Sequence, residues 1–395
     1  MIPVELDVVE QFGRVVARPW ADAVTGVQID SRRIAEGDLF VAVSSGSDFV
    51  EHALARGASA ALVPDDAHAA LAGISTVVRE RARARVVAIT GSTGKTSTKD
   101  ILFAMCAPHL RTIANEGNYN NELGVPLTLC RLEPDTQICI TEMGMRGHGQ
   151  IAQLAAIAKP DVGVVTNVGP VHLELVETVE NVARAKAELI EALPAGGVAV
   201  VPDEPLLEPY LTRGDIEIER VDPESPLPFR TSYSSRHQLA NTRLAVVVAR
   251  RLGVPLPEGE LSVEFSKLRE EEHPLPGGGL LLNDCYNANP VSMRAALEHL
   301  AERAGPHRRV AVLGEMAELG ATAPAYHRDV GELVRELGVH VIAVGALARD
   351  YGGEWVATAA EAADTLRAEL RPGDVVLVKG SRSVGLEVVA ENLTA

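Results

Sequence analysis

Residues 86–100 read VVAITGSTGKTSTKD, an apolar run followed by small residues, a lysine and several hydroxyl-bearing side chains. The apolar run predicts a buried strand, and the residues after Gly94 predict the start of a helix. Backbone N–H groups and the helix dipole at such a turn favour a bound phosphate. Gly91 and Gly94 let the backbone approach phosphate oxygens, Lys95 can reach the terminal phosphates, and Thr96 can bind Mg²⁺. The stretch therefore predicts a nucleotide-binding α/β sheet.

The loop TGSTGKTS is a shortened variant of the phosphate-binding pattern GxxxxGK[ST]. That pattern requires glycine at position 89, where this chain has Ile89. A turn rich in small residues at a sheet edge is the alternative, and the strand-helix context counts against it. We expect the nucleotide to be bound by the whole loop, which comprises Gly91, Ser92, Thr93, Gly94, Lys95, Thr96 and Ser97.

The bulk composition is that of an α/β protein with aliphatic cores, because 46% of the 395 residues are hydrophobic and only 4% are aromatic. A chain of this length is expected to form more than one domain. The net charge of −17 argues against a nucleic-acid partner. No apolar run is long enough to span a bilayer and the N-terminus has no signal-peptide pattern, so we expect a cytoplasmic protein that is not embedded in a membrane.

Three domains are predicted along the chain. Residues 1–85 form a small α/β domain with strands in VQIDSRRIAEGDLFVAV, SAALV and STVV, and it ends in the Arg-rich linker RERARAR. Residues 86–265 alternate apolar strands with amphipathic helices, which predicts a mostly parallel sheet of the phosphate-loop type. Residues 266–395 alternate in the same way and predict a Rossmann-like domain. GxGxxG is absent there, so nicotinamide binding is not indicated.

Polar side chains follow the strands on either side of the loop strand. Glu142 ends the strand in ITEMG, while Asn167 and His172 follow the next one in TNVGPVHLE. The carboxyl ends of parallel strands meet at one sheet edge, so Glu142 is a candidate Mg²⁺ ligand and His172 a candidate for a second metal. An exposed strand-end glutamate and a histidine satisfied by its surroundings are the alternatives.

Lys186, in ENVARAKAEL, lies on a predicted helix that begins near Thr178 or Glu180. An exposed helical lysine is the ordinary alternative. Lysine is scarce in this chain, with six among 37 basic residues, and a cation beside a metal pair is unfavourable unless its charge changes. A desolvated lysine can lose its proton and react with CO₂, which gives a carbamate anion able to bind a metal.

Two further segments are rich in amide side chains. Those of EGNYNNELGVP, residues 116–126, can hydrogen-bond a polar substrate, although a turn-rich loop is the alternative. In NDCYNANPVSM, helix capping explains Asn289 and Pro290. Asp284, Tyr286 and Asn287 are not explained by capping and suit an adenine or ribose at a domain cleft.

The motifs TGSTGKTSTKD, GNYNNELGVP, EMG, TNVGPVHLE, AKAEL, RHQLAN, DCYNANPVSM, LGEMAELG and VKGSR occur in this order. Together they resemble the Mur ligases over nearly the whole chain, from DSRRIAEGDLFVA onward. YNANP, EMG and GNYNN are similar to the members that add D-alanyl-D-alanine. The DYAHTP and DNPR-like motifs of the members that add the third residue are absent.

The resemblance implies an ATP-dependent amide ligase of peptidoglycan synthesis. The γ-phosphoryl of ATP would pass to the terminal carboxylate of UDP-MurNAc-tripeptide, and the amine of D-Ala-D-Ala would then attack the acyl phosphate. The resemblance implies catalytic roles for Lys95, Glu142, His172 and Lys186 and two Mg²⁺ ions. Thr96 and Glu142 would hold one ion, and His172 and a carbamylated Lys186 the other.

The resemblance also implies contacts to the substrates and closure of the domains around them. We expect the protein to be a monomer. Asn287 would contact the adenine, and Ser31 and Arg32 the UDP moiety. The remaining candidates for substrate binding are Asn118, Asn120, Asn121, Asn167, Lys379, Ser381 and Arg382. One departure concerns UDP recognition, because this chain has SSGSDFVEHA where the family usually has a DGHDF-like stretch.

Three alternatives stay open. The chain can be another ligase of the superfamily, such as a third-residue Mur ligase or a folylpolyglutamate synthase. A nucleotide-dependent switch like a P-loop GTPase is disfavoured by the missing NKxD signature. A scaffold that only binds UDP-muropeptide would not need Lys95, Glu142, His172 and Lys186 together. The sequence does not identify the third residue of the tripeptide, which can be diaminopimelate, lysine or ornithine.

Overall fold

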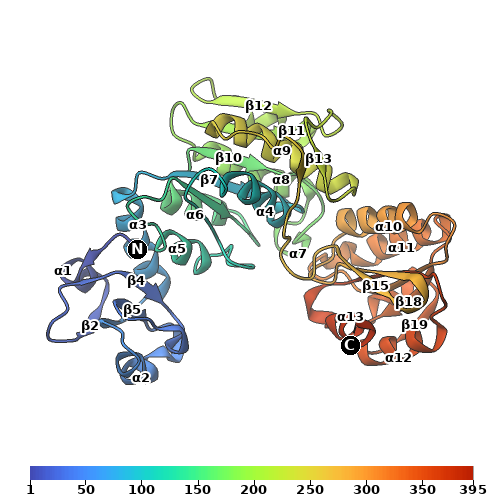
Figure 1. Ribbon diagram of the computed structural model, residues 1–395, viewed down its shortest axis with the longest axis horizontal. Helices are drawn as coiled ribbons and strands as arrows, with labels where there is room; N and C mark the ends of the chain where they lie inside the picture. Colours follow the sequence, from blue (N-terminus) through green and yellow to red (C-terminus); the bar gives the residue numbers. More distant parts are fainter. Residues whose placement is uncertain (395) are drawn as a thin grey trace.

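The structure, a computed structural model, describes residues 1–394 and contains three α/β units in chain order (Figure 1). The predicted α/β fold class with mostly parallel sheets is confirmed. Within residues 1–394, no helix is both long and apolar enough to span a bilayer.

The N-terminal unit is built on a four-stranded sheet of order β2-β6-β5-β4, in which only β2 runs antiparallel to its neighbour. A separate pair, β1 with β3, lies beside it. The elements are β1 (Val4–Glu5), α1 (Leu6–Val9), β2 (Arg14–Ala17), β3 (Ala23–Val24), β4 (Gly26–Gln28), β5 (Asp38–Val41), α2 (Val50–Ala55), β6 (Ala60–Val63) and α3 (Ala67–Arg81).

The strand predicted at STVV is wrong, because residues 75–78 lie in α3. The predicted linker RERARAR likewise begins inside this helix and ends in the next strand. Asp66 caps α3 by accepting hydrogen bonds from the N–H groups of His68 and Ala69. Leu71, Ile74 and Val78 then share one buried face. Burial at helical spacing outweighs the strand preference of the β-branched residues.

The central unit holds a six-stranded parallel sheet of order β12-β11-β10-β7-β9-β8. Its strands are β7 (Arg85–Thr90), β8 (Thr112–Ala114), β9 (Ile138–Glu142), β10 (Val162–Val165), β11 (Val198–Pro202) and β12 (Glu217–Val221). From β7 the chain first builds β8 and β9 on one side and then β10 on the other. Such a reversal leaves a crevice at the carboxyl ends of the strands.

Helices cover both faces of the central sheet. They are α4 (Lys95–Cys106), α5 (Gly124–Leu129), α6 (Gln150–Ala158), α7 (Leu173–Val176), α8 (Val179–Glu191) and α9 (Arg236–Leu252). Helices α4 and α9 share one apolar core, whereas α5, α6 and α8 share the other core with α3 of the N-terminal unit. Strands buried on both faces explain the apolar runs in the sequence.

The C-terminal unit has a six-stranded sheet of order β15-β16-β20-β17-β18-β19, with only the edge strand β15 antiparallel. The chain reaches it after a short pair, β13 (Arg230–Thr231) with β14 (Glu260–Leu261). Its elements are β15 (Glu271–Leu275), β16 (Gly279–Asn283), α10 (Pro290–Ala304), β17 (Arg309–Gly314), α11 (Ala323–Glu336), β18 (His340–Val344), β19 (Glu354–Val356), α12 (Ala359–Glu369), β20 (Val375–Lys379) and α13 (Glu387–Thr394).

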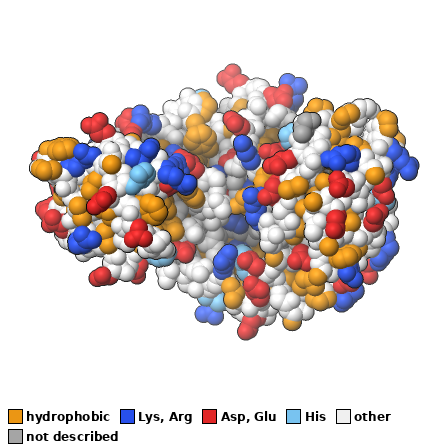
Figure 2. All heavy atoms as spheres, turned by 90° about the horizontal axis from the view of Figure 1, so that it is seen from below, with side chains coloured by type: hydrophobic (Ala, Val, Ile, Leu, Met, Phe, Trp, Pro, Cys, Tyr) orange, Lys and Arg blue, Asp and Glu red, His pale blue; other side chains and the backbone are white. Residues whose placement is uncertain are grey.

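The surface is hollowed between the N-terminal and C-terminal units (Figure 2). Lys and Arg side chains gather along this hollow although the chain carries a net charge of −17 (Figure 2). Local positive charge in a recess attracts anionic ligands even on an acidic protein.

Candidate active site

The phosphate loop joins β7 to α4 and depends on two glycines. Gly91 has φ +151°, and a Cβ there would lie 1.8 Å from the Thr166 hydroxyl. Gly94 precedes α4 with φ +76°, and a Cβ there would lie 2.5 Å from Asn241 Oδ1. At both positions the backbone conformation and the space around the Cα atom exclude a residue with a side chain, so the loop requires glycine at Gly91 and Gly94.

Asn167 braces this loop. Its Oδ1 accepts hydrogen bonds from the N–H groups of Ser92 (3.1 Å) and Thr93 (2.9 Å). The Ser92 hydroxyl donates to the Gly169 carbonyl at 3.0 Å. The sequence predicted Asn167 at this sheet edge, as a substrate contact. In the structure Asn167 lies at the edge, but its side-chain oxygen is hydrogen-bonded to the loop backbone.

Lys95, Thr96 and Glu142 form a buried polar centre beneath the loop. The Thr96 hydroxyl donates to Glu142 Oε2 at 2.7 Å, and Asn120 Nδ2 donates to Oε1 at 2.8 Å. Lys95 Nζ donates to the Gly91 carbonyl at 2.8 Å. Glu142 is 1% exposed. Burial alone would raise its pKa, but Lys95, Arg269 and the two hydrogen bonds together lower it, so the carboxylate is ionised.

His172 and Lys186 face the same centre. Burial lowers the pKa of His172, with Lys95 and Lys186 adding to the effect and Glu318 opposing it. Burial also holds the pKa of Lys186 well below its ordinary value, and Lys95 adds to this. Lys95 acts on Glu142, His172 and Lys186 alike, so the other three predicted catalytic residues all lie within electrostatic reach of Lys95.

Lys186 lies on α8, which begins where the sequence predicted. Thr178 is the capping residue, and its hydroxyl accepts a hydrogen bond from the Asn181 N–H. Lys186 is only 2% exposed. Within residues 1–394, its amine makes no hydrogen bond or ion pair.

The donor set fits Mg²⁺ better than a soft metal. Within residues 1–394, no three His, Cys, Asp or Glu side chains come together as a metal cage. The Thr96 hydroxyl and the Glu142 carboxylate are hard oxygen donors 2.7 Å apart, and Mg²⁺ ordinarily takes one or two such ligands beside water and phosphate oxygens. His172 and Lys186 can complete a second site only if the lysine becomes an anion.

A pocket of about 270 Å³ opens beside the loop, and sequence reasoning did not identify the helical residues that line it. Asn241 and His237 lie on its wall, and Asn241 Nδ2 is buried without a hydrogen-bond partner among residues 1–394. Both belong to the RHQLAN motif. Buried polar side chains at helical spacing, Gln238, Asn241 and Thr242, were the available signal. Asn287, predicted at the adenine, is exposed and does not line this pocket, and its Oδ1 accepts from the Ala288 N–H.

Arg269 was also missed. Its guanidinium lies 4.2 Å above the Tyr286 ring centroid, and its charge influences the pKa values of Lys95 and Glu142. Within residues 1–394, it makes no hydrogen bond or ion pair. The residue stands in a charge-rich linker, so nothing in the local sequence distinguishes it from its neighbours.

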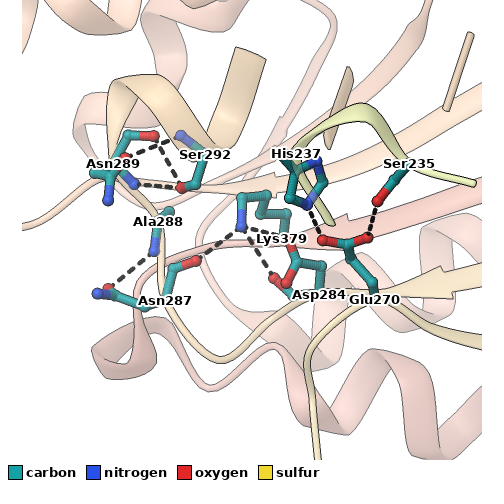
Figure 3. Close-up of polar contacts among 9 residues, drawn as sticks. All are labelled: Ser235, His237, Glu270, Asp284, Asn287, Ala288, Asn289, Ser292 and Lys379. Carbon is teal, nitrogen blue, oxygen red and sulfur yellow. Dashed lines mark hydrogen bonds and ion pairs between the residues drawn. The ribbon is translucent and has the colours of Figure 1, made fainter. Parts of the chain in front are cut away.

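The predicted C-terminal contacts lie within their own unit. Lys379 is 2% exposed, and its Nζ donates to Asp284 Oδ2 at 2.5 Å and to the Asn287 carbonyl at 2.9 Å (Figure 3). The Ser381 hydroxyl accepts from the Ala317 N–H at 2.8 Å. Arg382 pairs with Glu387 at 3.2 Å and remains largely exposed.

The other predicted substrate residues lie in two places. In the N-terminal unit Ser31 is 3.0 Å from His52 Nδ1, and exposed Arg32 pairs with Asp30. In the loop before α5, Asn121 Oδ1 accepts from the Gly124 N–H at 3.0 Å, and Asn118 is exposed. Among the predicted amides of this loop, Asn120 alone contacts the polar centre directly.

Three family models match the chain in order: Mur ligase family, catalytic domain, over residues 23–93; Mur ligase middle domain, over residues 89–214; and Mur ligase, glutamate ligase domain, over residues 270–382. A UDP-N-acetylmuramoyl-tripeptide–D-alanyl-D-alanine ligase from Synechocystis is 34% identical, with 94% of this chain and 92% of the relative covered. The chain belongs to the Mur ligase family.

Solved structures agree with this Mur ligase assignment. MurF from Acinetobacter baumannii superposes with a TM-score of 0.86 at 27% identity, and the match covers 99% of both chains. MurF from Thermotoga maritima in complex with ADP gives a TM-score of 0.83 at 28% identity, over 94% of this chain and 97% of that one. The resemblance drawn from the sequence motifs is therefore confirmed.

Proposed function

We propose that this Mur ligase joins D-alanyl-D-alanine to the terminal carboxylate of UDP-MurNAc-tripeptide, using ATP. The observation that carries the proposal is the buried centre at which the phosphate loop meets Glu142, His172 and Lys186. A binding scaffold or a dehydrogenase has no use for such a set. The printed names of the relatives with comparable length and fold support the choice of substrates.

The reaction needs two displacements. Lys95 and the phosphate loop act directly in the first one, the transfer of the phosphoryl group. A tripeptide carboxylate oxygen attacks the γ-phosphorus and ADP departs, leaving an acyl phosphate. The D-Ala-D-Ala amine then attacks the acyl carbon, and the tetrahedral intermediate collapses to an amide and inorganic phosphate. Lys95 and the loop N–H groups offset the negative charge that gathers at the phosphoryl group.

Two Mg²⁺ ions are part of the proposal. Thr96 and Glu142 would hold the first, and His172 with a carbamylated Lys186 the second. Bound there, the ions would supply charge neutralisation at the phosphates. The burial of Lys186 supports carbamylation, because the lowered pKa of its amine leaves more of the neutral, nucleophilic form.

The nucleoside part of ATP would occupy the pocket lined by Asn241 and His237, with Arg269 near the phosphates. The ADP complex of the Thermotoga maritima relative supports nucleotide binding. The contact of Asn287 with adenine stays a prediction.

The UDP-muropeptide and the dipeptide would be recognised outside this centre. Ser31 and Arg32 remain proposed for UDP, while the amides near residues 118–121 and Lys379, Ser381 and Arg382 remain proposed for the peptide substrates. We expect a monomer that acts in the cytoplasm, where these precursors are built.

Phosphate release tests the proposal. Purified protein with ATP and Mg²⁺ receives UDP-MurNAc-tripeptide and D-Ala-D-Ala singly and together, with diaminopimelate, lysine and ornithine tripeptides in parallel. We expect release only with both substrates, together with the mass of a UDP-MurNAc-pentapeptide. Release with a single free amino acid or with folate would instead favour one of the other superfamily ligases.

A further inference from the structure

Successive residues of the linker between the central and C-terminal units, residues 266–270, contact first one unit and then the other. The Ser266 N–H donates to Asp100 Oδ2 on α4 at 2.9 Å, which holds it to the central unit. The Leu268 carbonyl accepts from the Tyr286 N–H at 3.1 Å, in the C-terminal unit. Glu270 then returns to the central unit, where it contacts Ser235 and His237 (Figure 3). The five linker residues 266–270 therefore tie the phosphate-loop helix, α9 and the C-terminal sheet together.

The linker backbone is unusual at two positions. Leu268 has φ +62° and Glu270 has φ +50°, and neither residue is glycine. The left-handed region is disfavoured for residues with a Cβ and persists where surrounding contacts enforce it. Arg269 lies between the two, so its direction is set by two constrained neighbours.

The Glu270 carboxylate is the strongest of these anchors. Its side chain is 12% exposed, the Ser235 hydroxyl donates to Oε2 at 2.8 Å, and His237 Nε2 contacts Oε1. Ser235 precedes α9 in the capping position but makes no capping bond of its own. Its hydroxyl holds Glu270 instead, at the helix end where the dipole favours a carboxylate.

Arg269 directly precedes Glu270, so the contacts of Glu270 also restrain the position of Arg269. Its guanidinium stacks on Tyr286 and makes no hydrogen bond within residues 1–394, while its positive charge lowers the pKa of both Lys95 and Glu142. Helix α9 also carries Asn241, which stands against Gly94 of the phosphate loop. A contact that fixes the linker on α9 therefore fixes Arg269 relative to the loop.

We propose that Glu270 is a positioning residue that acts through Arg269: held by Ser235 and His237, it fixes the linker so that the guanidinium faces the nucleotide phosphates. The inference rests on the proposed ATP site and adds to it a residue outside the reaction centre. It predicts that Glu270 affects nucleotide binding without touching the nucleotide.

A double-mutant cycle tests this proposal. Calorimetry measures the Kd for ATP in the wild type, Glu270→Gln, Arg269→Gln and the double variant. We expect Glu270→Gln to weaken binding about 10-fold, the size of a lost charge-assisted hydrogen bond, and to add nothing in the Arg269→Gln background. The KM for ATP should rise while the KM for D-Ala-D-Ala stays constant. An equal weakening in both backgrounds, or none in either, overturns the proposal.

Controls separate positioning from misfolding and from failure of the ATP assignment. Glu264→Gln removes the same charge from an exposed linker position and should leave Kd unchanged. Ser235→Ala, a milder variant, should weaken binding in the same direction if Glu270→Gln proves unstable. Limited proteolysis without nucleotide should cut the linker faster in Glu270→Gln, and unchanged cleavage overturns the anchoring by itself. A wild-type protein that does not bind ATP overturns the proposed function instead.

Discussion

Lys186 is the residue whose surroundings depart furthest from those of an ordinary lysine. It is 2% exposed on α8, and burial with the nearby charge of Lys95 lowers its pKa. Burying an ammonium group in such a place costs free energy, which a folded protein tolerates where the group has a function. The influence of Lys186 on the pKa of His172 is consistent with the function proposed above, a carbamate that would bind metal.

Replacing Lys186 with Met tests this. The substitution keeps most of the side-chain volume and removes the buried amine, so we expect the free energy of unfolding to stay the same or rise by about 1 kcal/mol. Ligase activity should fall about 100-fold or more, because the second Mg²⁺ ion would lose a ligand. Urea unfolding and phosphate release measure the two effects. Lys267→Met, at an exposed linker position, is the control, and a fully active Lys186→Met contradicts the role.

Gly91→Ala tests the loop at the same scale. The new Cβ would lie 1.8 Å from the Thr166 hydroxyl in a backbone conformation that side chains rarely adopt. We expect a loss of about 1–3 kcal/mol in unfolding free energy and loss of ATP binding, measured by urea titration and calorimetry. Gly147→Ala, where no atom lies within 4 Å of the new Cβ, should change neither quantity.

At the scale of elements, the contact between α9 and the start of β15 combines opposite charges. Burial alone would lower the pKa of His237, but Glu270 and Asp284 raise it, while Lys379 opposes them. Burial alone would raise the pKa of Glu270, but His237, Ser235 and His299 lower it. Both groups are therefore charged together between the lowered pKa of Glu270 and the raised pKa of His237.

This pair predicts a pH-dependent stability. Since the folded pKa of His237 lies above its ordinary 6.5, its contribution is complete below that pH and is lost as the pH rises through the raised pKa. The contribution of Glu270 is present above its ordinary 4.5 and is lost as the pH falls through the lowered value. We expect wild type to exceed His237→Gln by about 0.5–1 kcal/mol near pH 6 and by less near pH 9, in urea unfolding. A pH-independent difference would contradict this account.

At the scale of the whole molecule, the C-terminal unit reaches the centre through residues 315–320. His172 Nδ1 lies 2.5 Å from Glu318 Oε2, and the Glu318 carbonyl accepts from the Glu174 N–H at 3.3 Å. His172 and Glu318 have φ values of +53° and +63°. The Glu318 carboxylate, which pairs with His172 Nδ1, would orient the other ring nitrogen to bind metal.

Glu318→Gln should therefore disturb the central unit from a distance. We expect the Mg²⁺ concentration for half-maximal activity to rise about 10-fold, because an outer carboxylate of this kind typically contributes 10–100-fold to metal affinity or activity. Titration of phosphate release with Mg²⁺ measures it. Glu332→Gln removes an exposed carboxylate from α11 in the same unit and should leave the titration unchanged. If the Mg²⁺ concentration for half-maximal activity is the same in Glu318→Gln and Glu332→Gln, Glu318 does not orient His172.

The sequence by itself determined the class of fold and the chemistry of the loop. Buried parallel strands require continuous apolar runs, and a phosphate loop requires glycine at Gly91 and Gly94, so both leave local signals. Lys95, Glu142 and His172 could be proposed from the sequence because each lies at the start of a helix or the end of a strand of that sheet, whereas Lys186, in the middle of α8, was proposed from the family resemblance and the scarcity of lysine. STVV misled the prediction because helical burial of Ile74 and Val78 is a tertiary effect.

The tertiary structure alone decided which distant residues join the site. Arg269, Glu270 and Glu318 come from the linker and another unit, and no spacing in the chain predicts their contact with the site. Tertiary structure also gave Asn167 and Lys379 partners inside the protein, the loop backbone and Asp284. Local propensity and periodicity act over a few residues, whereas contacts between units depend on how whole sheets pack, and that information is spread over the entire chain.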